Sequence, residues 1–172
     1  MQHWNKPQAT EHPESYTRYI EKVPQGNLIT QLSTQLNETI SFLKTIPKEK
    51  FNYRYAEGKW TIKQIIQHLS DCERVFCYRA LRFARNDNTA LAGFEENDYA
   101  NEANTELRSI EQLLEEFSAI RQSTLCLVKS FSDEELKRKG IANNKSISVN
   151  ALCYIIAGHE LHHASIIKER YL

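Results

Sequence analysis

Glycine and proline are scarce in this chain of 172 residues, which contains five glycines and four prolines. No segment alternates polar and apolar residues over a sustained length, so the sequence does not predict a β-sandwich or barrel. A run of about 18 apolar residues is also missing, and the polar first residues do not resemble a signal peptide. These absences favour an all-α cytoplasmic protein that does not enter a membrane.

An excess of charge of one sign is lacking as well, because 22 basic and 22 acidic residues give a net charge of zero. Proteins that bind nucleic acid usually carry a basic surface for the phosphates, so we expect no nucleic-acid partner. No CxxC pair occurs among the four cysteines, Cys72, Cys77, Cys126 and Cys153. They predict reduced thiols rather than a disulfide framework.

Four long amphipathic helices are predicted from apolar residues that recur every three or four positions. Capping residues mark where they begin, and the helices span about residues 27–46, 61–85, 109–131 and 148–171. A short helix starts at Ser132 and stops at Gly140, and residues 141–147 are expected to form a loop. Residues 1–26 predict an arm that packs on the domain. The chain is therefore expected to be a single four-helix-bundle domain, residues 1–172.

The last predicted helix carries an unusual cluster of polar residues, His159-Glu160-Leu161-His162-His163. At about 100° per residue, His159 and His163 lie on the apolar stripe, whereas Glu160 and His162 point elsewhere. A single histidine on such a stripe is usually a satisfied core residue. Two imidazoles one turn apart can instead aim their nitrogens at one point, as helices do when they supply two metal ligands.

A third ligand is available from His68, the only histidine on another long predicted helix. Together with His159 and His163 it would give three neutral imidazoles and leave at least one coordination position open to water or substrate. We expect one divalent transition metal per chain, zinc or nickel first and iron, cobalt or manganese as alternatives. Cys72, one turn after His68, is a further possible ligand, although a small buried cysteine is usually packing.

His159 to His163 also match H-E-x-x-H, the zinc-protease motif in which the glutamate is the general base. Only nine residues follow His163, and no strand precedes the helix, so we do not expect a peptidase. Glu160 remains a candidate catalytic residue for proton transfer, although we expect it to be an exposed residue on the helix surface. Asp98 and Tyr99 could reach the site from the long connection after residue 85.

Charged residues on the second predicted helix are expected to be solvated. Four arginines, Arg74, Arg79, Arg82 and Arg85, would form its polar face. Asp71 and Glu73 flank the same region, where either could orient an imidazole, but we expect both to be exposed.

Several longer motifs resemble those of the DinB/YfiT-like superfamily. They are Tyr55–Ile62 (YAEGKWTI), Gln67–Arg74 (QHLSDCER), Ala84–Asp87 (ARND), Gly93–Tyr99 (GFEENDY) and Ile156–His163 (IAGHELHH). The resemblance implies an up-down-down-up four-helix bundle, a homodimer, and a mononuclear divalent metal held by His68, His159 and His163. It also implies relatives that are transferases or isomerases using a low-molecular-weight thiol such as bacillithiol, mycothiol or glutathione.

Two functions of different classes follow. The first is a metal-dependent enzyme, a transferase of a low-molecular-weight thiol or a hydrolase that activates water. The second is a metal-stabilised binding or stress-response module without turnover. An open ligand position beside a polar cavity would favour the enzyme, and a sealed site would favour the module.

Overall fold

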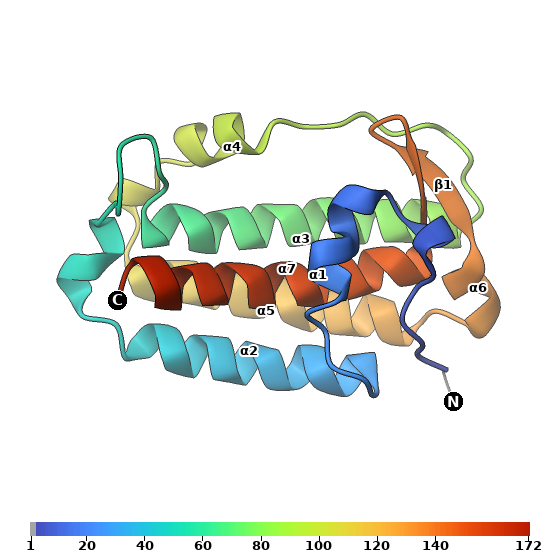
Figure 1. The fold of residues 1–172 in the computed structure, drawn as a ribbon, viewed down its shortest axis with the longest axis horizontal. Coiled ribbons are helices and arrows are strands. Elements are labelled where there is room, and N and C mark those ends of the chain that lie inside the picture. Colours follow the sequence, from blue (N-terminus) through green and yellow to red (C-terminus); the bar gives the residue numbers. More distant parts are fainter. Residues whose placement is uncertain (1–2) are drawn as a thin grey trace.

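The computed structural model describes residues 3–172. Four long helices dominate it: α2 (Leu28–Lys44), α3 (Ile62–Ala84), α5 (Ile110–Lys129) and α7 (Val149–Arg170). Helices α2 and α7 run in one direction and α3 and α5 in the other (Figure 1), which is the up-down-down-up order. The expected four-helix bundle is confirmed, with the first and third predicted helices each ending two residues earlier than expected.

Side-chain caps begin all four long helices at the predicted positions. The Asn27 side chain accepts a hydrogen bond from the Thr30 amide, and Ser148 accepts one from Ala151. Thr61 and Ser109 form reciprocal capping boxes with the glutamine three residues later. Each cap satisfies a backbone N–H that has no partner within its helix, so the starts are fixed locally.

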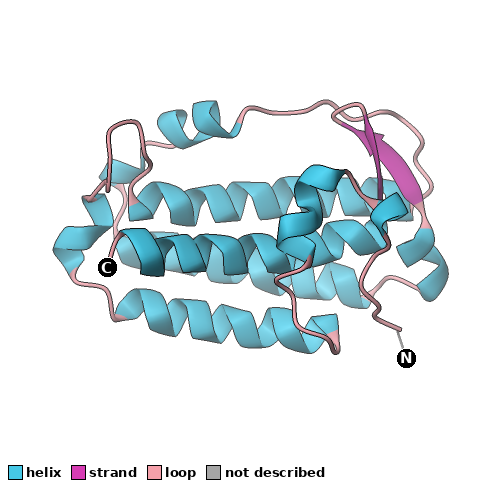
Figure 2. Ribbon diagram, viewed as in Figure 1, coloured by secondary structure: helices cyan, strands magenta, loops and turns pink. Residues whose placement is uncertain are grey.

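Short elements fill the connections: α1 (Thr17–Ile20), α4 (Glu96–Glu102), α6 (Asp133–Lys137) and two strands, β1 (Lys139–Ala142) and β2 (Lys145–Ser148). The strands pair as an antiparallel hairpin at one end of the bundle (Figure 2), so the prediction of a loop at residues 141–147 was wrong. Asn143 and Asn144 turn the chain with φ values of 49° and 60°, which suit a tight hairpin turn. The strands are too short to show a periodic pattern.

Helix α7 is the centre of the molecule. It packs on α1, α2 and α3, and its residues are buried without a break from Ala151 to Glu160. A helix buried on all sides is apolar all round rather than on one stripe. The single stripe predicted from its sequence therefore described only one of its packed faces.

The arm crosses α7 (Figure 1), and its Tyr19 packs against His159 of that helix. A Cβ atom on Gly158 would lie 1.9 Å from the Tyr19 carbonyl oxygen, so only glycine permits α1 to approach this closely. Tyr19 is thereby held against α7. Residues 1 and 2 of the predicted arm lie outside the described residues.

No helix within residues 3–172 is both long and apolar enough to cross a membrane.

Candidate metal centre

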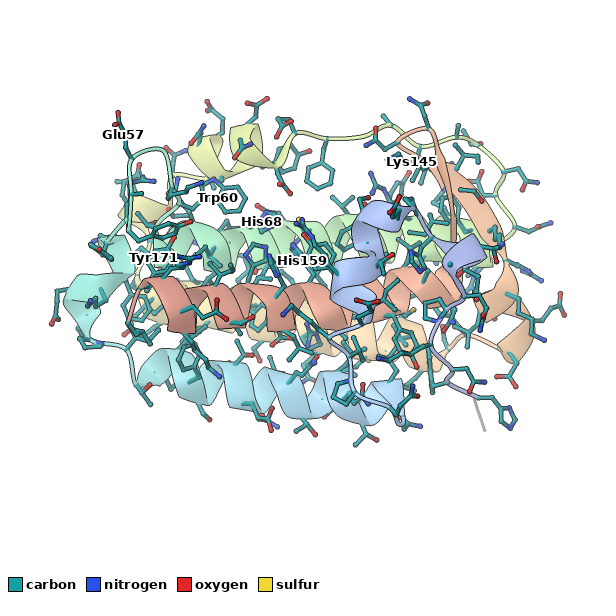
Figure 3. All side chains as sticks on the ribbon, in the orientation of Figure 1. Glu57, Trp60, His68, Lys145, His159 and Tyr171 are labelled. Carbon is teal, nitrogen blue, oxygen red and sulfur yellow. The ribbon has the colours of Figure 1, made fainter. Side chains whose placement is uncertain are left out.

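Three histidine rings meet between α3 and α7. The Nε2 atom of His159 lies 3.0 Å from Nε2 of His68 and 3.1 Å from Nε2 of His163. Figure 3 shows His68 and His159 projecting from their helices into the same space, with Trp60 close to His68. His68 is 4% exposed and His159 5% exposed. The structure thus brings together the three side chains that the sequence analysis selected.

Hydrogen bonding alone does not account for this arrangement. Each nitrogen of a neutral imidazole is either a donor or an acceptor, with one direction in the ring plane. His159 Nε2 therefore cannot form good hydrogen bonds with both of its neighbours. Two nitrogens bound to one zinc ion at about 2.0–2.1 Å are separated by about 3.3 Å in a tetrahedral site. Both nitrogen pairs that include His159 are already spaced almost as two ligands of a single metal ion, so these histidines fit the predicted metal.

Burial keeps these rings neutral. It lowers the pKa of His68 to about 4. For His163, burial and then the neighbouring His68, His162 and Arg18 lower the pKa to about 3. Burial also places the pKa of His159 well below its usual value. Neutral imidazole is the form that coordinates a metal, so no proton has to be displaced at neutral pH.

Cys72 adds a sulfur atom to the same cluster. Its Sγ lies 3.5 Å from Nδ1 and 3.7 Å from Nε2 of His68, and donor atoms of His68, Cys72 and His159 all lie within 4.8 Å of one another. Burial raises the pKa of the Cys72 thiol, so the free thiol is neutral. Two possible sets of three metal ligands therefore overlap. Both contain His68 and His159, and the third ligand is either His163 or Cys72.

Aromatic side chains enclose the histidines. The Trp60 ring centroid lies 4.6 Å from that of His68, and Tyr19 packs edge-on against His159 at 5.2 Å. Tyr19 also contacts His162 at 5.2 Å. The His162 ring also packs edge-on against that of His163, with centroids 5.1 Å apart, but within residues 3–172 no hydrogen bond joins His162 to the cluster. This apolar shell limits solvent at the nitrogens, and it accounts for the lowered pKa values.

Glu160 and Glu73 are not exposed, and this expectation was wrong. Glu160 is 1% exposed and accepts a hydrogen bond of 2.7 Å from Arg121, which is 0% exposed. Arg121 also forms a bidentate pair with Glu73, at 2.8 and 2.7 Å, and donates to the Leu32 carbonyl at 3.1 Å. The sequence could not show this because Arg121 resembles an ordinary polar residue of α5. A catalytic role for Glu160 stays a prediction, and its bound carboxylate oxygen is directed to Arg121.

Two cavities with largely different lining residues adjoin the cluster. The first has a volume of about 230 Å³ and reaches His159 and Cys72, with Tyr16, Arg79 and Phe94 among its other walls. The second, of about 250 Å³, reaches His163 beside Trp60. A larger apolar groove of about 380 Å³, between α2 and the start of α5, includes none of the cluster residues. The candidate site is thus accessible rather than sealed.

The crossover contributes a different residue from those expected. Asp98 and Tyr99 line an open hollow with Gln67 and do not reach either cavity, whereas Glu96 lines both. Burial, followed by the charge of Glu95, raises the pKa of Glu96. Glu96 lies one helical turn before Ala100, the buried residue of α4. The crossover contains several acidic residues, and its sequence gives no signal that distinguishes Glu96 from the others.

Arg79 is the other residue that the sequence analysis misplaced. It is 5% exposed rather than solvated, and it lines the cavity that reaches His159. A usable signal did exist, since Cys72, Phe76 and Arg79 follow His68 by four, eight and eleven residues. That spacing places all of them on one face of a helix.

Fold and site together define a helical bundle with a buried donor cluster suited to a metal ion. A sequence model of the DinB superfamily matches residues 31–167. The chain belongs to the DinB superfamily, which confirms the resemblance seen in its motifs.

Relatives agree with this assignment. A protein of Oceanobacillus iheyensis named "Putative metal-dependent hydrolase" is 25% identical over 142 residues, covering 81% of each chain. One of the same name from Geobacillus kaustophilus is 26% identical over 141 residues, covering 80% of this chain and 76% of its own. The fold is shared with YfiT from Bacillus subtilis, with a TM-score of 0.72, 16% identity, and coverage of 96% of this chain and 91% of that one. YfiT is described as "a probable metal-dependent hydrolase with an unusual four-helix bundle topology".

Proposed function

We propose that this protein is a metal-dependent hydrolase in which His68, His159 and His163 hold one divalent transition metal. The observation that carries the proposal is the position of His159 Nε2, within 3.0 and 3.1 Å of two other ring nitrogens. The names of the relatives supply the reaction class. Zinc and nickel are the first candidates for the metal, because imidazole ligands suit both.

His163 is preferred to Cys72 as the third ligand because of how each lies relative to His68. The Cys72 sulfur is as close to Nδ1 of His68 as to Nε2, so it lies beside the ring. The histidine Nε2 atoms instead face one another. Cys72 also has to lose a proton to ligate, which its burial disfavours.

Each part of the site has a separate task. When bound, a divalent metal would supply Lewis acidity and would lower the pKa of a coordinated water towards about 7. The three histidines hold their nitrogens neutral and converged, while Trp60 and Tyr19 fix the rings by packing. The cavities leave a path for a small substrate, and this access favours turnover over a purely structural site.

Metal analysis tests the ligand set. Purified protein should contain close to one divalent metal per chain, and His159→Ala should lose it. His162→Ala is the matched control, because His162 is adjacent in sequence but lies outside the cluster. A His159→Ala protein that keeps its full metal content would refute the proposed centre.

Cobalt substitution distinguishes the two possible third ligands. The cobalt protein should lack a thiolate-to-metal charge-transfer band, and its spectrum should be the same in Cys72→Ser. His163→Ala should change the spectrum. A charge-transfer band that disappears in Cys72→Ser would assign the sulfur as a ligand instead.

A second candidate, transfer of a low-molecular-weight thiol, is favoured by the presence of two cavities with largely different lining residues beside the cluster. One could hold the thiol and the other the electrophile. A panel of esters, amides and lactones, assayed with and without a cellular thiol, separates the candidates. Thiol-independent and chelator-sensitive hydrolysis supports the hydrolase, and product that forms only with thiol supports the transferase.

A further inference from the structure

Arg79 lies in an unusual position for a charged side chain. It projects from α3 at the wall of the 230 Å³ cavity and is only 5% exposed. Its Nη2 atom donates a hydrogen bond of 3.1 Å to the Ala92 carbonyl oxygen, and the Tyr16 hydroxyl is a further hydrogen-bond partner of the guanidinium. Within residues 3–172 no acidic side chain forms an ion pair with it.

A guanidinium in this setting has lost water without gaining a counter-charge. Burying a charge is unfavourable unless it is paired and hydrogen-bonded. The Phe94 ring, whose centroid is 5.8 Å from the Arg79 guanidinium carbon, offers only a weak cation–π contact. One carbonyl, the Tyr16 hydroxyl and one ring still leave most of the five N–H donors of the guanidinium free for a ligand.

The nearby acidic residues, Glu95 and Glu96, do not form ion pairs with Arg79. Glu95 accepts hydrogen bonds from the Asn97 amide and side chain, both at 3.2 Å, and caps α4. Glu96 forms no ion pair with Arg79 within residues 3–172; burial and the charge of Glu95 raise its pKa, and Arg18 opposes this rise. Both glutamates line the cavity, and their negative charges oppose a dianion more strongly than a monoanion.

The same cavity connects Arg79 to the candidate metal centre, since His159 and Cys72 also line it. Arg79 is three helical turns beyond His68 on α3. A ligand anchored at Arg79 would therefore keep its charged end apart from the group that it presents to the histidines. Tyr16 is a second polar wall of the cavity, close enough to Arg79 for the guanidinium to oppose the rise in the pKa of Tyr16 caused by burial.

We propose that Arg79 binds the carboxylate of the substrate, and that this site selects small monoanionic carboxylates whose reactive group reaches the histidine cluster. The planar guanidinium matches a carboxylate with two parallel hydrogen bonds. One unpaired positive charge and two glutamates at the wall favour a monoanion over a phosphate dianion. The identity of this ligand as the substrate rests on the proposed hydrolase function, but its binding does not.

Binding is best measured on metal-free protein, so that no carboxylate can coordinate a metal. Chelated wild-type protein is titrated with benzoate and propanoate, and with benzamide and inorganic phosphate as comparisons. Calorimetry gives the affinities, and the Arg79 side-chain resonance in NMR locates the ligand. We expect a carboxylate to bind, the amide not to bind, and phosphate to bind more weakly than the carboxylate.

Arg79→Met should weaken carboxylate binding roughly 10- to 100-fold, the usual effect of losing hydrogen bonds to a charged group. Arg79→Lys should restore part of the affinity. The control is Arg74→Met, an exposed arginine of the same helix that pairs with Glu116 at 2.5 Å. Arg79→Met should melt no lower than wild type without ligand, because an unpaired buried charge has been removed.

Equal affinity for the amide, tighter binding of phosphate, or unchanged carboxylate affinity in Arg79→Met would each overturn the proposal. A clear loss of stability in Arg79→Met would also overturn it, since that result assigns Arg79 to the framework. If carboxylates bind metal-free protein but the metal-loaded protein hydrolyses no carboxylate-bearing ester, the proposed hydrolase function fails while the Arg79 site stands.

Discussion

Arg121 and Arg79 are both buried in the bundle, but they differ in what surrounds them. Arg121 lies between α3, α5 and α7 and binds two carboxylates and a backbone carbonyl. Arg79 has a carbonyl and the Tyr16 hydroxyl as partners but no carboxylate within residues 3–172, and it faces a cavity. A buried charge whose partners are all supplied by the chain serves the framework, whereas one whose partners are incomplete is available to a ligand.

The same contrast separates the two polar clusters shared by α3 and α7. The ring nitrogens of His68 and His159 lie close together but cannot satisfy all of their hydrogen bonds with one another. Glu73 and Glu160, in contrast, both bind Arg121. Adjacent residues of one helix, His159 and Glu160, thus belong to different parts of the protein. The first turns towards the candidate metal centre and the second towards the structural ion network.

The largest effect is expected from Arg121→Met. It leaves the Glu73 and Glu160 carboxylates buried without a counter-charge, which should lower the free energy of unfolding by about 3–5 kcal/mol. Urea denaturation measures the loss. Metal content per folded molecule should be unchanged, and a stability within about 0.5 kcal/mol of wild type would contradict a framework role.

Removing the metal should have the next largest effect. A metal present at about 100 times its Kd stabilises the folded state by about 2.7 kcal/mol, and this contribution disappears on chelation. Thermal melting with and without chelator measures it. The thermal stability of His163→Ala should change little when chelator is added, whereas Arg121→Met should still lose stability on chelation. The reverse pattern would show that the two clusters are not independent.

Acid should destabilise the metal-free protein in a defined range of pH. The pKa of His68 is about 4 and that of His163 about 3, compared with about 6.5 for an unfolded histidine. Between these values the unfolded chain binds more protons, so the free energy of unfolding falls as the pH drops below about 6.5. Each histidine contributes up to about 1.4 kcal/mol per pH unit.

Urea titrations of chelated protein at pH 7, 6 and 5 would measure this dependence. His68→Gln should reduce the slope by roughly a quarter to a third, because it removes one of four histidines whose pKa is lowered, the others being His159, His162 and His163. A slope that does not change in this variant would show that other groups cause the loss of stability.

The smallest effect is expected from Glu160→Gln. An amide oxygen can still accept the hydrogen bond from Arg121, and the cluster changes from two carboxylates per guanidinium to one. We expect a loss of about 1 kcal/mol. Glu73→Gln should cost more, because it breaks a bidentate pair. Chemical denaturation of both variants gives the order, and a larger loss for Glu160→Gln would contradict the described geometry.

Local signals made the bundle predictable from the sequence. Four capped helices with regular apolar spacing were identified at nearly their observed positions, because a cap and a periodic face depend on neighbouring residues. The convergence of His68 with His159 and His163 was also expected, since few other histidines were available. The hairpin at residues 139–148 was missed because its two strands are only four residues each.

The burial of Arg79, Arg121 and Glu160 could not be predicted in the same way. A charged residue is normally solvated, and its burial is decided by partners that are distant in sequence. Arg121 is 39 residues from Glu160 and 48 from Glu73. Arg79 is covered by the crossover at Ala92 and Phe94, which has no periodic pattern. Such contacts depend on tertiary structure.

The long connection between α3 and α5 is required by the order of the helices. Two consecutive long helices that run in the same direction need a segment that returns along the bundle, and α3 with its 23 residues is about 34 Å long. Phe94, Glu95 and Glu96 on this return path form a wall of the cavity at His159. The topology therefore places the histidines on the long helices and part of the cavity wall on the return segment. The return segment can change in sequence and alter the cavity while the helices that hold the histidines stay the same.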